Sequence, residues 1–525
     1  PWEAEHILNK PTARVVIVGG GTAGWITAGL LAADHARSTG RGIEITLIES
    51  PDVPTIGVGE GTWPSMRATL QRIGIAELDL VRHCDASFKQ GTYFRNWAAE
   101  STGYYHPFSL PAEWPTLPLA GYWLDSRTAA SFAQFVTPQA DIMEAGLGPR
   151  EAGMPPYTHV VNYGYHFDAG KFAGLLHEHA VGKLGVSYVS ANVEHVETHE
   201  DGDIAGLRLD TGAVVNGDLF IDCTGQKSLL LGQHFGVAFR PVKDVLFNDR
   251  AIAVQVPHES PHDPVASATV STAVDAGWIW DIALRPRRGI GYVHSSAHTD
   301  EDEAVATLQS YVREHFPATS LDDLAFRTIP FEPGYRDRFW VKNCVAIGLS
   351  GGFIEPLEAS ALALIEQSAM LLSRQFPADR DLMRVVARRF NAKLEYHWQR
   401  VIEFLKLHYV LTKREDTAYW RDNRKPEHCP EELADKLVLW EQQSPWYDDA
   451  PHVDELFPAA SYQYVLYGMG FRPRHRQVVE STGIEDRQRL DRALFENAEK
   501  LRKMRTRLPS NRQLLEDLVG LNEVA

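Results

Sequence analysis

The sequence predicts an α/β fold with three parts: a discontinuous Rossmann-type domain, a mainly β middle region and a helical C-terminal part. Three observations support this prediction. A glycine cluster at residues 19–24 separates a β-branched run from a helical stretch. Short apolar segments that stop at glycine return in the middle of the chain. After Glu358 the apolar residues follow helical spacing.

The composition excludes several classes of protein. The 525 residues are 44% hydrophobic and 23% charged, as in ordinary soluble globular proteins. A net charge of −17 disfavours nucleic-acid binding, because few cations remain to neutralise phosphates. Glycines interrupt the uncharged stretch 15–33, so we expect no membrane span, and no signal peptide is predicted. Because Cys84, Cys223, Cys344 and Cys429 form no C-x-x-C pair, we expect no metal site, no disulfide framework and a cytoplasmic location.

The first unit is typical of a βαβ arrangement. A β-branched run, the glycine cluster and a helical stretch fill residues 12–31, and residues 42–50 alternate like a second strand ending in an acid. The glycines fit G-x-G-x-x-G, which lets the backbone turn tightly and approach a pyrophosphate at a helix N-terminus. A carboxylate at the strand end accepts from ribose hydroxyls and disfavours a 2′-phosphate, which predicts FAD or NAD. The candidate cofactor-binding residues are Gly19, Gly20, Gly21, Thr22, Ala23, Gly24 and Glu49.

Later segments favour FAD and a discontinuous domain. Residues 217–225 read as a strand ending in D-x-x-G, as in hydroxylase-type flavoproteins, although a merely structural strand stays open. Segments 214–225 and 340–352 predict late strands that return to the first sheet. We expect helices after residue 358 and over 379–411, and loops that could cover a site at 107–118 and 444–467. The predicted FAD-binding domain comprises 11–105, 155–235 and 330–375, and the predicted substrate-binding region comprises 106–154, 236–329 and 376–525.

Six motifs occur in an order that resembles the flavin-dependent tryptophan halogenase family over most of the chain. They are GGGTAGW at Gly19, IGVGEGTWPS at Ile56, ASFKQGTYFRNW at Ala86, YYHPF at Tyr104, GWIWDI at Gly277 and FIEPLEAS at Phe353. The family's W-x-W-x-I-P motif is here W-I-W-D-I-A, with Ala283 in the usual place of proline. The resemblance implies an FAD-dependent monooxygenase-like fold.

The resemblance also implies a reaction. In this family reduced FAD, O₂ and halide give hypohalous acid, which must reach an aromatic substrate through a walled passage. Trp278 and Trp280 match the wall residues and Lys89 matches the lysine that meets the acid. Lys89 could form a haloamine or hydrogen-bond the acid, and both alternatives stay open. Glu358 matches the family's catalytic glutamate, which could stabilise the cationic ring, accept its proton or orient Lys89.

The remaining site residues are also implied by the resemblance. The halide would bind the amides of Ser360 and Ala361, where the family's E-S-T-G is replaced by E-A-S-A, so chloride and bromide both stay open. Further FAD contacts would come from Val58, Gly61, Val193, Leu349 and Leu362. The aromatic substrate would lie against His106, Phe108, Trp446 and Tyr447.

The substrate lid departs from that of the family's free-tryptophan enzymes. Their Phe-Trp pair and Asn, which grip the amino-acid charges, are missing here, where residues 455–462 read ELFPAASY. The ammonium and carboxylate of free tryptophan would lose their bound water in this site without gaining partners there. We therefore expect free tryptophan to be a poor substrate compared with indole, a phenol, a pyrrole or a larger indole. With a single G-x-G-x-x-G, we expect a separate NADH-dependent flavin reductase as partner, and a homodimer stays open. The alternatives are a flavin hydroxylase and a non-catalytic FAD-binding protein.

Overall fold

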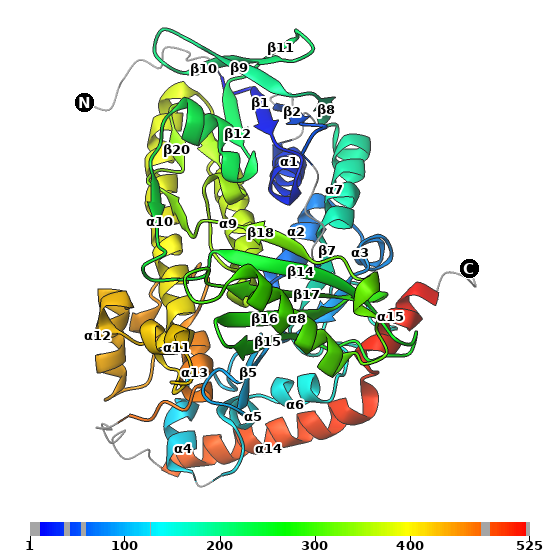
Figure 1. Cartoon of the computed structure of the whole chain (residues 1–525), viewed down its shortest axis with the longest axis vertical. Helices are drawn as coiled ribbons and strands as arrows, with labels where there is room; N and C mark the ends of the chain where they lie inside the picture. The colour runs from blue at the N-terminus through cyan, green and yellow to red at the C-terminus, as the bar shows by residue number, and fades with distance from the viewer. Residues whose placement is uncertain (1–10, 36–41, 54–58, 127, 474–483, 521–525) are drawn as a thin grey trace.

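The computed structural model of the protein describes residues 11–35, 42–53, 59–126, 128–473 and 484–520 (Figure 1). Val58, one of the predicted cofactor contacts, lies outside these residues. Within them, the helices are each too short or too polar to cross a membrane.

A parallel sheet forms one end of the molecule, with the first strand in its centre (Figure 1). Its order is β20 (Trp340–Val341), β21 (Cys344–Ala346), β12 (Leu219–Asp222), β1 (Arg14–Val18), β2 (Glu44–Glu49) and β8 (Ser187–Ser190). All neighbours are parallel except β20 and β21. The late strands β12 and β21 therefore return to the first sheet as predicted.

The run of valine and isoleucine in β1 is explained by burial on both faces. Val15 and Ile17 pack into the main core, which includes α1 (Thr22–His35). Val16 and Val18 face the opposite way, onto a small antiparallel sheet. That sheet has the order β11 (Val214–Asn216), β10 (Ile204–Leu209) and β9 (Val193–Thr198). Helices α7 (Ala169–Leu184) and α9 (Ser360–Arg374) pack against α1, which confirms the Rossmann-type fold class.

A second large sheet forms the middle of the molecule. Its order is β18 (Arg327–Pro330), β14 (Arg250–Pro257), β17 (Arg287–His294), β16 (Gly277–Ala283), β15 (Thr269–Val274), β5 (Gly91–Arg95) and β6 (Gly103–Pro107). Ile279 of β16 packs in a cluster with α8 (Glu301–His315), whereas Trp278 and Trp280 belong to the main core. Strands β5 and β6 lie mostly within segment 11–105 yet pair in this sheet, so the domain boundaries stay a prediction.

The described residues also form two smaller antiparallel sheets. One has the order β3 (Gly59–Gly61), β7 (Gly164–Asp168) and β4 (Ser87–Lys89). The other has the order β13 (Phe239–Pro241), β19 (Gly334–Arg336) and β22 (Gly352–Phe353). In the first of them, Gly61 and Lys89 lie on strands at opposite sides of β7.

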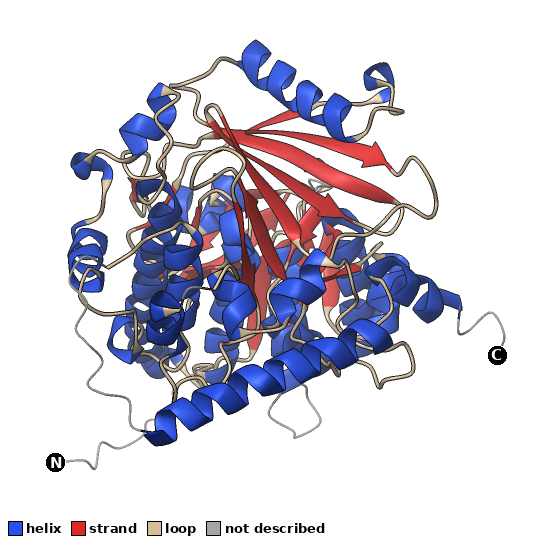
Figure 2. Ribbon diagram, turned by 90° about the horizontal axis from the view of Figure 1, so that it is seen from below, coloured by secondary structure: helices blue, strands red, loops and turns tan. Residues whose placement is uncertain are grey.

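Helices cover the sheets on several sides (Figure 2). Helix α10 runs along one side of the molecule and contacts α9, α11, α12 and α13 (Figure 1). The remaining helices are α2 (Ser65–Ile73), α3 (Glu77–His83), α4 (Leu119–Asp125), α5 (Phe132–Val136), α6 (Gln139–Glu144), α10 (Arg380–Val410), α11 (Ala418–Asn423), α12 (Glu431–Trp440), α13 (Ala459–Gly468), α14 (Ile484–Arg507) and α15 (Asn511–Gly520).

The loop prediction for residues 444–467 is wrong in part, because α13 begins at Ala459. Pro458 precedes the helix, a position that tolerates proline because the first turn needs no N–H donor. Nearly every residue of α13 is buried, so the segment lacks the apolar and polar alternation by which surface helices are identified.

Candidate active site

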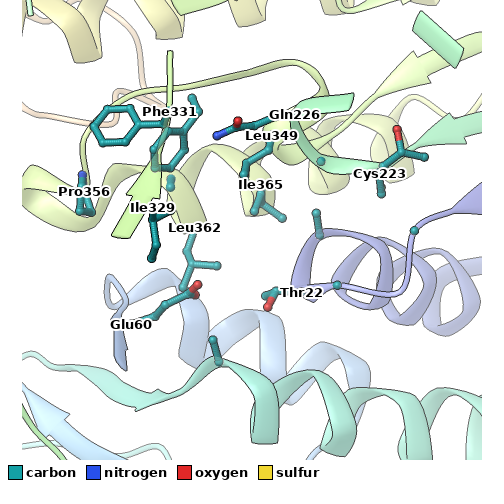
Figure 3. A pocket seen from close by; sticks show the side chains of 18 of the residues that line it. Thr22, Glu60, Cys223, Gln226, Ile329, Phe331, Leu349, Pro356, Leu362 and Ile365 are labelled. Atoms are coloured by element: carbon teal, nitrogen blue, oxygen red, sulfur yellow. The ribbon is translucent and has the colours of Figure 1, made fainter. Parts of the chain in front are cut away.

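One cavity of about 540 Å³ joins most of the predicted site, and we call it the central cavity (Figure 3). Its cofactor end is lined by the glycine turn and Glu49, and its lysine end by Lys89 and Glu358. The predicted cofactor residues on its wall are Gly19, Gly20, Gly21, Thr22, Ala23, Glu49, Gly61, Val193, Leu349 and Leu362. Trp278, Trp280 and Ala361 also line it. The predicted FAD contacts and the predicted catalytic pair thus share one space.

The glycine turn leaves room for a pyrophosphate. Gly19 has φ +117°, and a Cβ there would lie 2.1 Å from the Cys223 carbonyl oxygen. A Cβ on Gly24 would lie 1.9 Å from the Gly19 carbonyl oxygen, which explains why Gly24 packs behind the turn and does not line the cavity. A Cβ on Gly21, in contrast, would meet no atom within 4 Å and would project into open space. The turn therefore fits the diphosphate of FAD, with Glu49 close to Gly20 for the ribose.

Two substitutions in this turn are expected to separate binding from folding. In Gly21→Val the side chain would occupy the pyrophosphate space, so we expect FAD affinity to fall by about 100-fold or more while the fold is kept. In Gly24→Val the side chain would overlap backbone, so we expect a loss of several kcal/mol in stability, about 3 or more. Flavin fluorescence titration and thermal unfolding measure the two effects. A Gly21→Val protein that binds FAD normally would contradict the assignment.

Lys89 lies at the end of β4 with only 1% of its surface exposed. Gly61 allows its close approach, since a Cβ there would lie 3.0 Å from Lys89 Nζ. The ammonium also lies 5.5 Å from the centre of the Phe108 ring. Burial lowers the pKa of Lys89 from its ordinary 10.5 to about 8, and the charge of Glu358 partly offsets this effect.

The backbone at Glu358 has an unusual conformation. Glu358 and Ala359 both adopt left-handed φ angles, of 62° and 55°. Neither is a glycine, so the turn carries strain that the surrounding contacts must offset. One such contact is Trp63, whose Nε1 donates to the Glu358 carbonyl oxygen at 2.7 Å. The left-handed pair turns the chain into α9 beside the central cavity.

The Glu358 side chain is hydrogen-bonded by one histidine and a threonine, and a second histidine lies close to it. His106 Nδ1 lies 2.6 Å from Glu358 Oε1, and His408 Nε2 lies 3.3 Å from the same oxygen without completing a hydrogen bond. Thr92 Oγ1 donates weakly to Oε2 at 3.5 Å. Burial raises the pKa of Glu358, but the charge and hydrogen bond of His106, with His408 nearby, outweigh it and hold the pKa well below its usual range. Glu358 is therefore ionised at neutral pH.

The predicted halide site lies at the first turn of α9. Ser360 and Ala361 are the first two residues of this helix. The helix therefore contains no carbonyl four residues earlier that could accept from their N–H groups. Ala361 lines the cavity, and the buried Ser360 hydroxyl has no hydrogen-bond partner among the described residues. Such a helix start is able to hold an anion.

The two tryptophans of β16 form part of the cavity wall. Trp278 and Trp280 lie on the same face of the strand with their ring centres 6.4 Å apart, edge to face. Gly291 on the neighbouring strand makes room for Trp280, because a Cβ there would lie 2.0 Å from the ring. The indole nitrogen of Trp278 donates to Glu355 Oε2 at 2.6 Å.

The four predicted substrate contacts lie outside the wall of the central cavity. Phe108 packs against Lys89. His106 bonds Glu358 and, through Nε2, Ser461 at 3.0 Å, so both of its ring nitrogens are engaged. Trp446 packs against Trp114, with ring centres 4.5 Å apart, and Tyr447 is 53% exposed. Their role in substrate binding stays a prediction.

Sequence reasoning missed several residues that line or support the site. Glu60 lines the cavity and points into it (Figure 3), and burial with the charge of Asp168 raises its pKa to about 7. Trp63 and Glu60 both lie in the IGVGEGTWPS motif, which could have singled them out. His408 offers no such signal, because it lies inside the long helix α10.

The family model described as tryptophan halogenase matches residues 14–483. A tryptophan 7-halogenase of Lentzea aerocolonigenes, RebH, is 34% identical over 88% of this chain and 90% of its own length. The crystal structure of a tryptophan halogenase from Shewanella frigidimarina is 47% identical, with a TM-score of 0.93 over 97% of this chain and 98% of that one. BrvH, a flavin-dependent halogenase from Brevundimonas, is 35% identical with a TM-score of 0.83 over 97% and 99%.

Proposed function

The chain belongs to the tryptophan halogenase family, a family of flavin-dependent enzymes, and we propose that it uses reduced FAD, O₂ and chloride or bromide to halogenate an electron-rich aromatic ring such as indole. The main support is that one cavity contains both the glycine turn and the buried amine of Lys89. An oxidant made at the cofactor end can therefore reach the lysine end without crossing bulk water.

Each end of the cavity has a separate task in this proposal. When reduced FAD is bound at the glycine turn, it would oxidise halide to hypohalous acid together with O₂. The amides of Ser360 and Ala361 hold the halide, and Trp278 and Trp280 wall the passage. The acid then meets Lys89.

We assign Lys89 its charged form at this step. With a pKa of about 8, its ammonium predominates at pH 7 and is able to hydrogen-bond the acid and sharpen the electrophilic halogen. The ionised carboxylate of Glu358 stabilises the cationic ring intermediate or accepts the ring proton. His106, which donates to that carboxylate, fixes its orientation.

The proposed reaction also requires a source of reduced FAD and an aromatic acceptor. A separate NADH-dependent flavin reductase supplies reduced FAD, and the reaction takes place in the cytoplasm. The acceptor is a small aromatic molecule, and the altered lid favours indole over free tryptophan.

The test is an assay with a flavin reductase, NADH, O₂ and each halide in turn, over a panel of indoles and phenols. We expect products whose mass spectra carry a chlorine or bromine isotope pattern. Hydroxylated products formed without halide would identify a monooxygenase instead. Retained FAD binding with no product at all would identify a binding protein.

A further inference from the structure

A buried carboxylate joins the cavity wall to the helical part of the molecule. Glu355 is 1% exposed and lies three residues before Glu358, ahead of the turn 357–359. Its Oε2 accepts from Trp278 Nε1 at 2.6 Å, Asn248 Nδ2 at 2.7 Å and Tyr409 OH at 2.7 Å. Its Oε1 is buried with no hydrogen-bond partner among the residues that the structure describes.

The three donors come from parts of the chain that are far apart in sequence. Trp278 belongs to β16, Tyr409 to α10, and Asn248 to the segment before β14. Asn248 also accepts from Tyr419 OH at 3.0 Å, so the network reaches α11. Glu355 is therefore one of the points at which the second large sheet is tied to the C-terminal helices.

The contact with Trp278 constrains the orientation of the indole ring. An indole has a single polar atom, and Nε1 can only donate. Two aromatic rings also lie beside it, Trp97 at 6.3 Å and Trp280 at 6.4 Å between ring centres. Such apolar contacts tolerate several ring rotations, whereas a short hydrogen bond to a carboxylate selects one.

We propose that Glu355 is a positioning residue that fixes the indole of Trp278 in the wall of the passage that joins the cofactor end to the lysine end of the central cavity. This inference rests on the proposed function, because the orientation of the Trp278 ring affects the reaction only if hypohalous acid moves along the cavity. A displaced ring would change the passage, so more hypohalous acid would return to bulk solvent before it reached Lys89.

The test compares the amount of hypohalous acid that escapes into solution with the amount that halogenates the substrate. A thioether in solution, methionine, traps escaped hypohalous acid as its sulfoxide, and halogenated indole records the acid that reached the substrate. In Glu355→Leu, which removes the acceptor, we expect the ratio of trapped to productive oxidant to rise about fivefold or more. If this variant does not fold, Glu355→Gln, which keeps the shape but loses the charge, should shift the ratio about twofold in the same direction.

Two further variants isolate the contact with Trp278. Tyr409→Phe removes a different donor from the same oxygen and should leave the ratio equal to that of the unmodified protein. In a Trp278→Phe background, which lacks the indole N–H, adding Glu355→Leu should change the ratio by less than about twofold.

The outcomes separate this inference from the proposed function. A folded Glu355→Leu protein with less total oxidised halide but an unchanged ratio would show a merely structural role and overturn the inference. The same conclusion follows if Glu355→Leu has its full effect in the Trp278→Phe background. An unmodified protein that forms neither halogenated indole nor trapped oxidant would instead overturn the proposed function.

Discussion

Replacement of Lys89 by methionine is expected to abolish halogenation and at the same time stabilise the fold. The ammonium is buried, and the fall of its pKa from 10.5 to about 8 corresponds to about 3 kcal/mol of destabilisation of the charged form. Methionine fills a similar volume without a charge, so we expect the free energy of unfolding at pH 7 to rise by about 1–3 kcal/mol. Product formation should fall by about 1000-fold, because the group that meets the oxidant is gone.

The pH dependence of the free energy of unfolding tests whether the buried charge of Lys89 causes the stabilisation in Lys89→Met. Between pH 8 and 10.5 the unfolded chain holds the lysine proton and the folded protein releases it, so the stability of the unmodified protein rises with pH in this window. The advantage of Lys89→Met is therefore greatest below pH 8 and shrinks as the pH approaches 10.5. Denaturant unfolding at pH 7 and pH 9.5 measures it.

Lys183→Met, at the exposed end of α7, is the matched control and should change stability by less than about 0.5 kcal/mol. FAD binding by Lys89→Met should remain normal. If Lys89→Met instead retains halogenation, the lysine has no chemical role and the proposed mechanism is wrong.

Free tryptophan is expected to react with a kcat/KM about 100-fold or more below that of indole. The lid residue that could take an ammonium, Glu455, already accepts from Tyr396 OH and from the His452 amide. Phe457 is packed face to face on Phe404, with ring centres 3.7 Å apart. The zwitterion would therefore lose its hydration without finding new partners.

Intermediate substrates show which charge is responsible. Tryptamine carries only the ammonium and indole-3-propionate only the carboxylate, so each should fall between indole and free tryptophan. Competition assays with equimolar mixtures, read by mass spectrometry, give the ratios directly. Equal rates for indole and free tryptophan would mean that the lid holds the amino-acid group by contacts outside those described above.

The parts of the site that depend on local sequence could be predicted. The glycine turn is predictable because its spacing follows from backbone geometry: Gly19 needs a positive φ and Gly24 needs close packing. Lys89 and Glu358 were identified through motifs, and the fold brings both to one cavity 269 positions apart in sequence. The fold class was predictable for the same reason, since strands such as β1 are apolar on both faces.

The parts that depend on tertiary contacts could not be predicted. His106 was assigned to a substrate clamp, but nothing in its local sequence indicates that both ring nitrogens bond Glu358 and Ser461. His408 reaches Glu358 only because α10 passes the site. Similarly, the packing of Trp446 on Trp114 joins two proline-rich segments whose relative position is set by α13 and β6.

The strand order of the parallel sheet bears on how this protein is made. The central strand β1 pairs with β12, and β12 in turn pairs with β21, which ends at residue 346. During translation one strand edge of the N-terminal unit therefore stays unpaired until residue 346 has left the ribosome. Recombinant production should accordingly benefit from slow synthesis or added chaperones, and fragments that stop before residue 344 should aggregate rather than fold.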